Sequence, residues 1–420
     1  MQEESFDNYS ILTFYFASTM MDEKLACFLT GGGVRVMNNF NFHHYTNIVF
    51  GKGTEAQVGA LTAQLGKKVL LHYGGGSIKK SGLYDRVVAS LKAAGVEYVE
   101  LGGVKPNPRL SLVHEAVELC RREGVDCILA VGGGSVIDSA KAISIGVPYE
   151  GDVWDFYCQK ATPASALKIG VVLTIPAAGS ETNLGSVITN EATAVKLNLN
   201  YAGYKPQFAI LNPELTYSLP LDQTAYGVCD ILAHIMERYF TPTEGVDFSD
   251  RVLEGAMRSV INIGPQVLEH PTDYTARANI MWAGCLGHSG ILGSDRIGDW
   301  GSHRLTHQIG AIYDIAHGAA LAIAFPAWMK YVYKEHLPRF VQFAQRVFDV
   351  DLAVDNPEEI AHEGIRRLEA FFKRLGLSTR FSDVGIDSMN FESIAEFIAP
   401  TGNLKKLSKE DVVAIYHLAL

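Results

Sequence analysis

Short apolar runs rich in β-branched residues alternate with helical stretches between about residues 38 and 213, and this alternation restricts the fold more than any other feature. The runs that we expect to be strands are residues 47–50, 68–72, 98–101, 127–131, 170–175 and 208–211. Helices are expected between them, for example over residues 109–123 and 136–145. Strands and helices in this order form βα units around a parallel sheet. The first half of the chain therefore predicts an α/β domain.

The second half of the chain lacks this alternation, because strand patterns fade after Pro220 and helical patterns continue to the C-terminus. Asn356-Pro357-Glu358-Glu359 predicts a helix start, with a capping side chain, a proline in the first turn and two acidic groups at the positive end of the helix dipole. Ser408 with Asp411 predicts the start of a last helix in the same way. At 420 residues the chain exceeds the usual size of a single core. We expect an α/β domain over residues 37–215 and an all-helical domain over residues 216–420, with the functional site between them.

Residues 1–36 differ from both domains. They contain an apolar patch over residues 11–17, but Glu3, Glu4 and Asp7 precede it where a secretory signal carries positive charge. Met37 is a second plausible translation start, and the sequence after it has the pattern of a folded protein. We expect residues 1–36 to be an upstream extension outside the fold, and we do not expect export.

The charge balance and the cysteines exclude several classes of partner. A net charge of −10 and a pI near 5.7 leave no basic field for nucleic-acid phosphates. The longest uncharged apolar run, residues 318–329, is too short to span a bilayer and contains Pro326. The six cysteines are scattered without a C-x-x-C pair, which favours free thiols in a reducing compartment. We expect a cytoplasmic protein that binds neither nucleic acid nor membrane.

Two glycine-rich segments follow expected strands. One contains Gly132, Gly133, Gly134, Ser135 and Asp138, and the other contains Gly74, Gly75, Gly76, Ser77, Lys79 and Lys80. Glycines let backbone N–H groups approach an anion closely, and a helix N-terminus adds electrostatic attraction. The first segment matches neither G-x-G-x-x-G nor the P-loop pattern, and its alternative interpretation is a tight turn capped by Ser135.

The segment after Gly74 also bears on the choice of cofactor. In dinucleotide-binding folds an acidic residue near this point bonds the ribose 2′-hydroxyl, whereas cations and small residues accommodate a 2′-phosphate. The segment has no carboxylate and leads into Lys79 and Lys80, so it favours NADP(H) over NAD(H). Alternatively, both lysines are ordinary solvated residues. A third polar loop, with Thr174, Ser180 and Asn183, could supply hydroxyl and amide groups to the nicotinamide half.

Three of the 13 histidines lie between residues 299 and 318. His303 and His307 are four residues apart and share one face of a helix. His317 is 14 residues beyond His303, or about 21 Å along an unbroken helix, so the two can share a small ligand only if the helix breaks. Gly310 is the expected break. The alternative is a set of polar residues on an amphipathic helix.

Asp230 and His234 are also four residues apart, on an expected helix that is predominantly apolar. Charge there is costly unless it is paired or coordinated. Asp230 could cap a helix and His234 could be a core histidine, but together with His303 and His317 they offer one oxygen and three nitrogen ligands. Such a set suits Fe²⁺ or Zn²⁺, and the sequence does not choose between the two metals.

The order and spacing of these motifs resemble the iron-containing alcohol dehydrogenase family, in its NADPH-dependent butanol dehydrogenase and aldehyde reductase branch. The resemblance runs from Met37 to the C-terminus and includes MNNFNF, YGGGS, Pro106-Asn107-Pro108 and GGGSVIDSAK. Asp230, His234, His303 and His317 fall where the family's metal ligands fall, and His307 matches a histidine near the nicotinamide. Two departures concern cofactor contacts: Ala178 replaces a more common threonine, and Asn212 stands where aspartate is more usual.

The resemblance implies a Rossmann-like dinucleotide-binding domain, an all-helical metal-binding domain and a homodimer that interconverts short- to medium-chain aldehydes and primary alcohols by hydride transfer. His307 is the expected proton donor, acting through the cofactor ribose, or else it supports a metal ligand. The residues expected to bind NADP(H) are Gly74, Gly75, Gly76, Ser77, Lys80, Asn107, Gly132, Gly133, Gly134, Ser135, Asp138, Thr174, Ser180, Asn183 and Lys196. Two alternatives are a dehydroquinate synthase-like lyase without net redox, and a non-catalytic nucleotide- or metal-binding protein.

Overall fold

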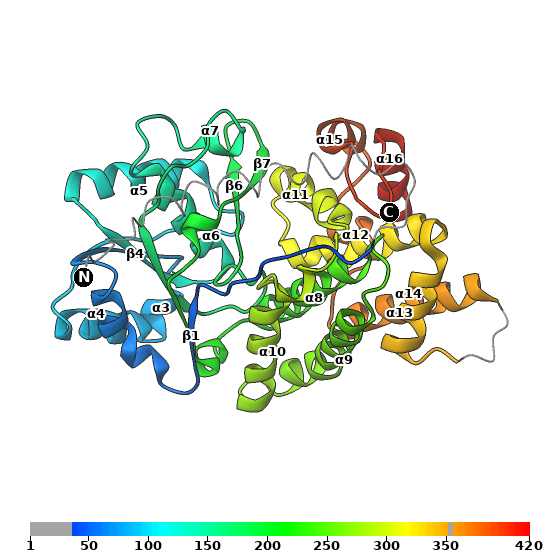
Figure 1. The fold of residues 1–420 in the computed structure, drawn as a ribbon, viewed down its shortest axis with the longest axis horizontal. Helices are drawn as coiled ribbons and strands as arrows, with labels where there is room; N and C mark the ends of the chain where they lie inside the picture. The colour runs from blue at the N-terminus through cyan, green and yellow to red at the C-terminus, as the bar shows by residue number, and fades with distance from the viewer. Residues whose placement is uncertain (1–35, 352–355) are drawn as a thin grey trace, which may run out of the picture.

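The computed structural model describes residues 36–351 and 356–420. The expected extension over residues 1–36 therefore lies outside the described residues, except for Val36. Figure 1 shows a sheet with its helices on one side of the molecule and helices alone on the other. This is the combination of an α/β half and an all-helical half that the sequence predicts.

Six parallel strands of the described residues form one sheet in the order β1-β8-β5-β4-β2-β3. They are β1 (Asn47–Phe50), β2 (Lys68–Tyr73), β3 (Glu97–Leu101), β4 (Cys127–Gly132), β5 (Lys168–Leu173) and β8 (Phe208–Leu211). Every expected strand is present, and β5 begins and ends two residues earlier than expected. The inner strands β2, β4 and β5 are almost wholly buried, which explains their continuous apolar sequences.

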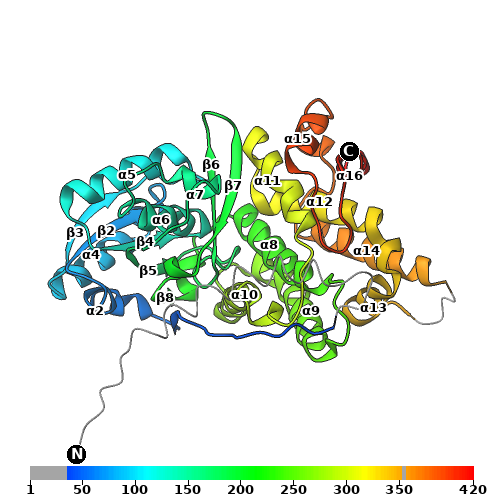
Figure 2. The ribbon, with the colours of Figure 1, turned by 45° about the horizontal axis from the view of Figure 1, so that its top comes forward.

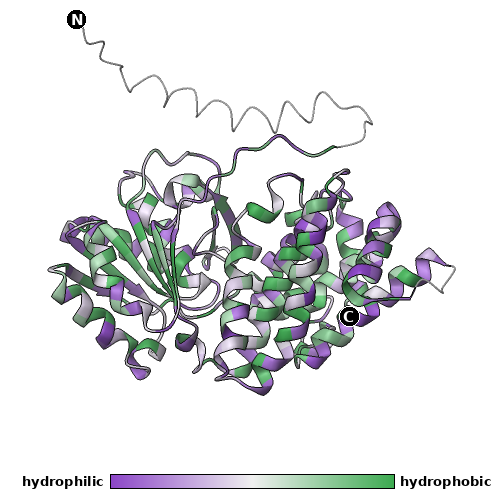
Figure 3. Ribbon diagram, turned by 60° about the horizontal axis from the view of Figure 1, so that its bottom comes forward, coloured by the Kyte–Doolittle hydropathy of each residue, from purple (hydrophilic) through white to green (hydrophobic). Residues whose placement is uncertain are grey.

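Helices cover both faces of this sheet. They are α2 (Val58–Ala63), α3 (Ser77–Lys80), α4 (Leu83–Ala93), α5 (Leu110–Glu123), α6 (Gly134–Gly146) and α7 (Trp154–Tyr157). Leu70 of β2 and Ile128 of β4 pack with residues of α5 and α6. Their neighbours in the sequence, Val69 and Leu129, pack on the other face with residues of α2 and α4. Successive side chains of each strand point to opposite faces of the sheet and so pack into two separate hydrophobic cores. Figure 3 shows the strands as apolar through most of their length.

A β-hairpin that the sequence analysis did not predict stands apart from the sheet. It joins β6 (Gly185–Asn190) to β7 (Val195–Asn200) in antiparallel register. Figure 2 shows it between the sheet half and helix α11 (Gly301–Tyr313), and α11 contacts β7 directly. The hairpin therefore links the two halves of the molecule.

The helical half is built around α8 (Leu221–Tyr239), whose residues from Gly227 onward are all buried. The surrounding helices are α9 (Asp247–Glu269), α10 (Tyr274–Gly287), α11, α12 (His317–Val332), α13 (Leu337–Phe348), α14 (Pro357–Arg374), α15 (Phe391–Ile398) and α16 (Lys409–Leu418). Two expected helix starts are confirmed. Asn356 caps α14 by accepting from Glu358 N, and Ser408 with Asp411 forms a capping box at α16.

Short 3₁₀ turns complete the chain and connect the longer elements. They are η1 (Thr54–Gln57), η2 (Ala202–Tyr204), η3 (Pro213–Thr216), η4 (Ile291–Gly293), η5 (Tyr333–His336) and η6 (Ser382–Val384). Asn212 caps η3 through Glu214 N and also donates to Glu55 Oε2 at 2.8 Å, so its side chain has partners within the protein.

The helix break between His303 and His317 exists, but the expectation that it falls at Gly310 is wrong. Gly310 lies inside α11, and the chain leaves the helix only at Asp314, which is left-handed at φ 51°. A Cβ atom on Gly310 would lie 3.5 Å from Lys196 Nζ and 3.6 Å from Asn107 Oδ1. Both distances are ordinary van der Waals contacts, so Gly310 lies beside Lys196 and Asn107 within the helix. The reversal is made by an aspartate, a residue type that tolerates the left-handed conformation.

Three further observations bear on the sequence expectations. Residues 36–46 run along the helical half before they enter β1, with Asn38 N donating to Asp295 O at 2.8 Å (Figure 1). Within the described residues, Cys120, Cys127, Cys158, Cys229 and Cys285 are free thiols. No helix in the same residues is both long and apolar enough to cross a membrane.

Candidate metal and cofactor site

Helix α8 holds two polar side chains inside an otherwise apolar packing layer. Asp230 and His234 are one turn apart and each is only 4% exposed. His234 Nδ1 donates to the backbone oxygen of Asp230 at 2.8 Å, which fixes the imidazole ring. Burying a polar atom without a partner costs free energy, so the polar atoms of Asp230 and His234 that this contact leaves unpaired need a partner from another residue or a bound ion.

The turn between α11 and α12 brings two more imidazoles to the same point. His303 is the third residue of α11 and His317 is the first residue of α12. Their ring centroids are 5.3 Å apart, and the ring of His303 is 4.4 Å from that of His234. Residues from three helices therefore converge.

The ligand atoms of Asp230, His303 and His317 all lie within 4.8 Å of one another. Asp230 Oδ1 is 3.9 Å from His303 Nε2 and 3.8 Å from His317 Nε2. Asp230 Oδ1 and His303 Nε2 are buried and, within the described residues, have no hydrogen-bond partner. A divalent cation fits this arrangement, because it would supply the partner that both atoms lack.

His234 and His307 lie beside this three-residue cluster. His234 contacts this cluster through its ring, which lies against His303, and through Nδ1, which is 3.3 Å from Asp230 Oδ1. The ring of His307 is 5.8 Å from that of His317. The cluster opens toward solvent at His317, whose side chain is 25% exposed, compared with 7% for His303 and 6% for Asp230.

The protonation states suit metal binding. Burial holds the pKa of His234 and His307 well below its ordinary value, and partial burial with the nearby Lys196 ammonium does the same for His317. These imidazoles are therefore neutral at pH 7, which is the form that coordinates metals. Burial raises the pKa of Asp230 to about 6, against the opposing effect of His303. A bound cation would favour its ionised form.

The expected cofactor loops meet at the carboxyl edge of the sheet. Gly74 follows β2, Gly132 ends β4 and Thr174 follows β5, and these three strands are neighbours. Thr174 N donates to Gly132 O at 3.0 Å. A Cβ atom on Gly132 would lie 2.4 Å from Val136, whereas Gly75 and Gly76 face open space. The segment Gly74 to Ser77 thus leaves room for a ligand, and Gly133 and Gly134 open helix α6 without a side-chain cap at its N-terminus.

Three expected cofactor residues, Asp138, Ser180 and Asn183, are joined by a lysine that the sequence analysis did not select. Lys141 Nζ donates to Ser180 Oγ and Asn183 Oδ1 at 2.9 Å each, and to Gly185 O at 2.7 Å. Ser180 Oγ donates to Asp138 Oδ1 at 2.5 Å. Burial raises the pKa of Asp138 and lowers that of Lys141 to about 8. This network connects α6, the polar loop and β6.

A second polar network connects the sheet half to the helical half. Lys196 Nζ donates to Asn107 Oδ1 at 2.8 Å, and Asn107 Nδ2 donates to Asp314 Oδ1 at 3.0 Å. Arg109 Nη2 donates to the same oxygen of Asp314 at 2.8 Å. Because Asp314 lies three residues before His317, this network joins two expected cofactor residues to the expected metal site.

The segment near the expected 2′-phosphate has a neighbour that the sequence analysis overlooked. Glu100, on the adjacent strand β3, lies 3.9 Å from Lys79 and accepts from Tyr84 Oη at 2.6 Å. Ser77 and Lys80 are exposed at the two ends of α3. Lys80 has no ion-pair partner within the described part of the chain. A carboxylate is thus nearby, but it is paired with Lys79.

Two other residues belong to the site and were missed. Glu237 is three residues after His234 and accepts from His303 Nδ1 at 2.8 Å. Its spacing on α8 from Asp230 and His234 is the signal that could have identified it. The ring of His288 lies 4.1 Å from that of His234 and stacks on Trp300, and His288 Nδ1 donates to Ala178 O at 2.8 Å. No local pattern marks His288.

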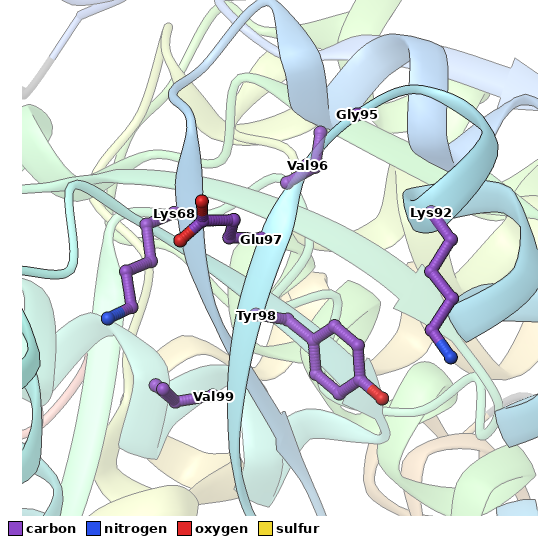
Figure 4. A pocket seen from close by; sticks show the side chains of 7 residues that line it. All are labelled: Lys68, Lys92, Gly95, Val96, Glu97, Tyr98 and Val99. Carbon is purple, nitrogen blue, oxygen red and sulfur yellow. The ribbon is translucent and has the colours of Figure 1, made fainter.

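A shallow depression beside β3 lies at the opposite edge of the sheet (Figure 4). It is lined by Lys68, Lys92, Gly95, Val96, Glu97, Tyr98 and Val99. Lys68 begins β2 and Glu97 begins β3, so the depression is at the amino ends of the strands. Ligands of open α/β sheets bind at the carboxyl ends, where the glycine segments lie.

Two family profiles match nearly the whole described chain. Residues 46–213 match "Iron-containing alcohol dehydrogenase", and residues 224–420 match "Fe-containing alcohol dehydrogenase family, C-terminal". The first profile covers the sheet and the hairpin, and the second covers the helices that carry Asp230, His303 and His317.

Individual proteins are similar over the same length. A probable NADH-dependent butanol dehydrogenase of Bacillus subtilis is 43% identical over 91% of this chain and 100% of its own. The NADPH-dependent aldehyde reductase YqhD of Escherichia coli is 36% identical over 90% of this chain and 97% of its own. The solved structure of NADH-dependent butanol dehydrogenase A from Thermotoga maritima is 42% identical, with a TM-score of 0.88 over 92% of this chain and 99% of that one.

Proposed function

The chain belongs to the iron-containing alcohol dehydrogenase family and is an alcohol dehydrogenase or aldehyde reductase, and from this premise we propose that it interconverts short- to medium-chain aldehydes and primary alcohols with NADP(H) and one divalent metal, Fe²⁺ or Zn²⁺. The observation that carries the proposal is the convergence of Asp230, His303 and His317 within 4.8 Å. The relatives named above are redox enzymes, so they do not favour a lyase or a non-catalytic protein.

We propose that Asp230, His234, His303 and His317 hold the metal. Asp230 Oδ1 and His303 Nε2 support this set, because both are buried and lack a hydrogen-bond partner among the described residues. The neutral imidazoles of His234 and His317 support it as well. His234 joins it because its Nδ1 is occupied by the Asp230 carbonyl, which leaves Nε2 free for coordination. When bound, the metal would polarise the carbonyl group of an aldehyde and the nicotinamide would supply the hydride.

The residues of the protein are proposed to hold the cofactor and the substrate and to deliver a proton. His307 is the proposed proton donor, since it is buried next to His317 and outside the ligand cluster. The segments after β2, β4 and β5 would hold the phosphates, ribose and nicotinamide of the cofactor through Gly74, Gly132 and Thr174 and their neighbours.

The proposed preference for NADP(H) rests on the segment after Gly74. Gly75 and Gly76 face open space and Lys80 is exposed without an ion pair in the described residues, so a 2′-phosphate has both room and a cation. The nearest carboxylate that we identify, Glu100, is occupied by Lys79 and Tyr84. The relatives include both NADH- and NADPH-dependent enzymes, so this preference has to be measured.

The test is an oxidation assay with NADPH and NADH over a panel of C3 to C5 aldehydes, on protein whose metal content has been measured. We expect aldehyde-dependent oxidation of both cofactors with a lower KM for NADPH. The Lys80→Ala variant should lose much of this preference, because it removes the cation near the 2′-phosphate. A lower KM for NADH in the wild-type protein would refute the NADP(H) assignment but leave the reductase activity standing.

We also propose that the protein is a homodimer, as its family resemblance implies. Strand β1 lies at the edge of the sheet; Tyr45, two residues before it, is 59% exposed and Phe50, its last residue, is 38% exposed. An open strand edge with exposed aromatic side chains is suited to pairing with another chain.

A further inference from the structure

Glu237 is the most completely buried acidic side chain near the metal cluster. It lies on α8, three residues after His234 and seven after Asp230, so all three side chains share one face of the helix. Its exposure is 0%. A carboxyl group in this position needs several hydrogen-bond donors to offset the loss of water.

Within the described residues, the donors to this carboxyl group come from the first turn of α11 and from the residue that precedes it. Glu237 Oε1 accepts from the His303 ring Nδ1 at 2.8 Å, from His303 N at 3.0 Å and from Ser302 Oγ at 2.6 Å. Glu237 Oε2 accepts from Trp300 N at 2.5 Å. One carboxyl group on α8 therefore holds both the backbone and the ring of a residue in the metal cluster.

The ring contact determines which nitrogen of His303 is available. A carboxylate oxygen only accepts, so Nδ1 carries the hydrogen and the lone pair lies on Nε2. Nε2 is the atom that faces Asp230 Oδ1 at 3.9 Å and that lacks a hydrogen-bond partner in the described residues. Glu237 thus holds His303 in the tautomer and orientation that a metal requires.

The backbone contacts determine where His303 stands. Trp300, the residue before α11, is left-handed at φ 61° and provides no side-chain cap. The first N–H groups of a helix have no partner within the helix, and a side chain near the N-terminus usually accepts from them. Here Glu237 accepts from two of them across the space between two helices, so α8 fixes the start of α11.

We propose that Glu237 is a positioning residue for the metal site: it fixes the His303 ring through Nδ1 and the first turn of α11 through the backbone, and thereby increases the affinity for the metal. This inference rests on the proposed function, since it needs His303 to be a ligand. Partners of this kind typically contribute about 10- to 100-fold in metal affinity. We do not propose Glu237 as a ligand, because both of its carboxyl oxygens accept hydrogen bonds from Trp300, Ser302 and His303 in the described residues.

The experiment measures the dissociation constant of Zn²⁺ by chelator competition in the wild-type protein, E237Q, E254Q and H317A, at one pH. Glu254 is a matched control, since it is a 4% exposed carboxyl group on α9 that accepts from Tyr239, Gln342 and Arg346 and does not contact the cluster. We expect the constant to rise about 10- to 100-fold in E237Q. In E254Q we expect a change of less than about threefold.

The outcomes separate this inference from the proposed metal site. If the wild-type protein and H317A bind Zn²⁺ equally weakly, the metal site itself is wrong. If H317A loses the metal but E237Q binds it as tightly as the wild-type protein, the role of Glu237 is wrong. A general loss of stability would affect E254Q as well, and metal-free melting curves of all four proteins measure that effect directly.

A second variant covers the case in which E237Q does not fold. Glu237→Asp keeps an acceptor for the start of α11 but shortens the side chain by one methylene group, so it cannot keep both the backbone and the ring contacts. We expect the visible absorption spectrum of the Co²⁺-loaded protein to shift in this variant, because the His303 ring changes orientation. An unchanged spectrum together with an unchanged Co²⁺ affinity would show that the ring contact does not position the ligand.

Discussion

At the scale of single residues, the described imidazoles of the site share one arrangement. His234 Nδ1 faces the Asp230 carbonyl, His303 Nδ1 faces Glu237, and His317 Nδ1 lies 3.4 Å from Thr306 Oγ1. Thr306 uses its own hydrogen to donate to His303 O at 2.8 Å, so toward His317 it can only accept. Each Nδ1 therefore carries hydrogen, and each Nε2 is left with its lone pair for a metal.

This arrangement predicts opposite results for two neighbouring histidines. His317→Ala should lose bound metal and turnover together, because it removes a ligand. His307→Ala should keep the metal and lower kcat by roughly 10²- to 10⁴-fold, as expected for loss of a general acid. Metal analysis by mass spectrometry and steady-state assays on the same samples measure both effects. If His307→Ala also loses its metal, then His307 supports the site and does not deliver the proton.

The convergence of Asp230, His303 and His317 was predictable from residue type, spacing and family resemblance, whereas the residues that support these side chains were not. Asp230 and His234 are marked by a spacing of four on an apolar helix, and this pattern survives in the sequence alone. Glu237 continues the same helical face, but its meaning depends on α11 approaching α8. His288 reaches the site from the end of α10 through contacts with Ala178 and Trp300, and tertiary contacts of this kind leave no periodic pattern.

At the scale of elements, the connection between α11 and α12 determines the relative placement of His303 and His317. Asp314 makes the reversal in the left-handed conformation, and its carboxylate accepts from Asn107 and Arg109 in the sheet half. One residue thus shapes the turn and links it to the other half of the molecule. Sequence reasoning located the break at Gly310, because it weighed only the local preference of glycine.

The two roles of Asp314 can be separated by substitution. Asp314→Asn retains tolerance of the left-handed conformation but loses the charge facing Arg109, whereas Asp314→Ala loses both properties. We expect Asp314→Ala to lower the free energy of unfolding by about 1–2 kcal/mol and Asp314→Asn by less than about 1 kcal/mol. Urea unfolding of both variants measures the difference. Equal stability of Asp314→Ala and the wild-type protein would contradict this account.

The elements differed in how far the sequence predicted them. Strands β2, β4 and β5 are buried on both faces, so continuous apolar runs marked them. The hairpin of β6 and β7 lies outside the sheet and mixes buried with partly buried positions, including the polar sequence VKLNLN, so it lacked such a run. The starts of α14 and α16 were also predictable, because the capping residues lie next to the first turn in the sequence.

At the scale of the whole molecule, each half contributes a different part of the site. The sheet half carries the glycine segments, and the helical half carries Asp230, His303 and His317. Between them lie the contacts of Asp314 with Asn107 and Arg109, of Gln308 with Ala194, and of His288 with Ala178. The α/β and all-helical halves were predictable from strand and helix patterns, but these contacts were not, because each joins segments far apart in the sequence.

This division predicts that a metal ion bound to the folded helical half stabilises the folded state against unfolding. At a free Zn²⁺ concentration of 100 times its dissociation constant, the free energy of unfolding should rise by about 2.7 kcal/mol. Asp230→Ala should abolish this increase, since it removes the oxygen ligand. Calorimetric melting with Zn²⁺ and with a chelator measures the effect. A wild-type melting temperature that does not respond to metal would argue against a site in the folded state.

The strand order also has a consequence for biosynthesis. Within the described residues, β8 is the only strand that pairs with β1, and it lies about 160 residues later in the chain. A ribosome must therefore complete almost the entire sheet half before β1 can be paired. Until then this strand is an open edge on a growing chain, and open edges can associate with other chains. The interval before β8 emerges is thus one in which the nascent chain exposes this edge to association.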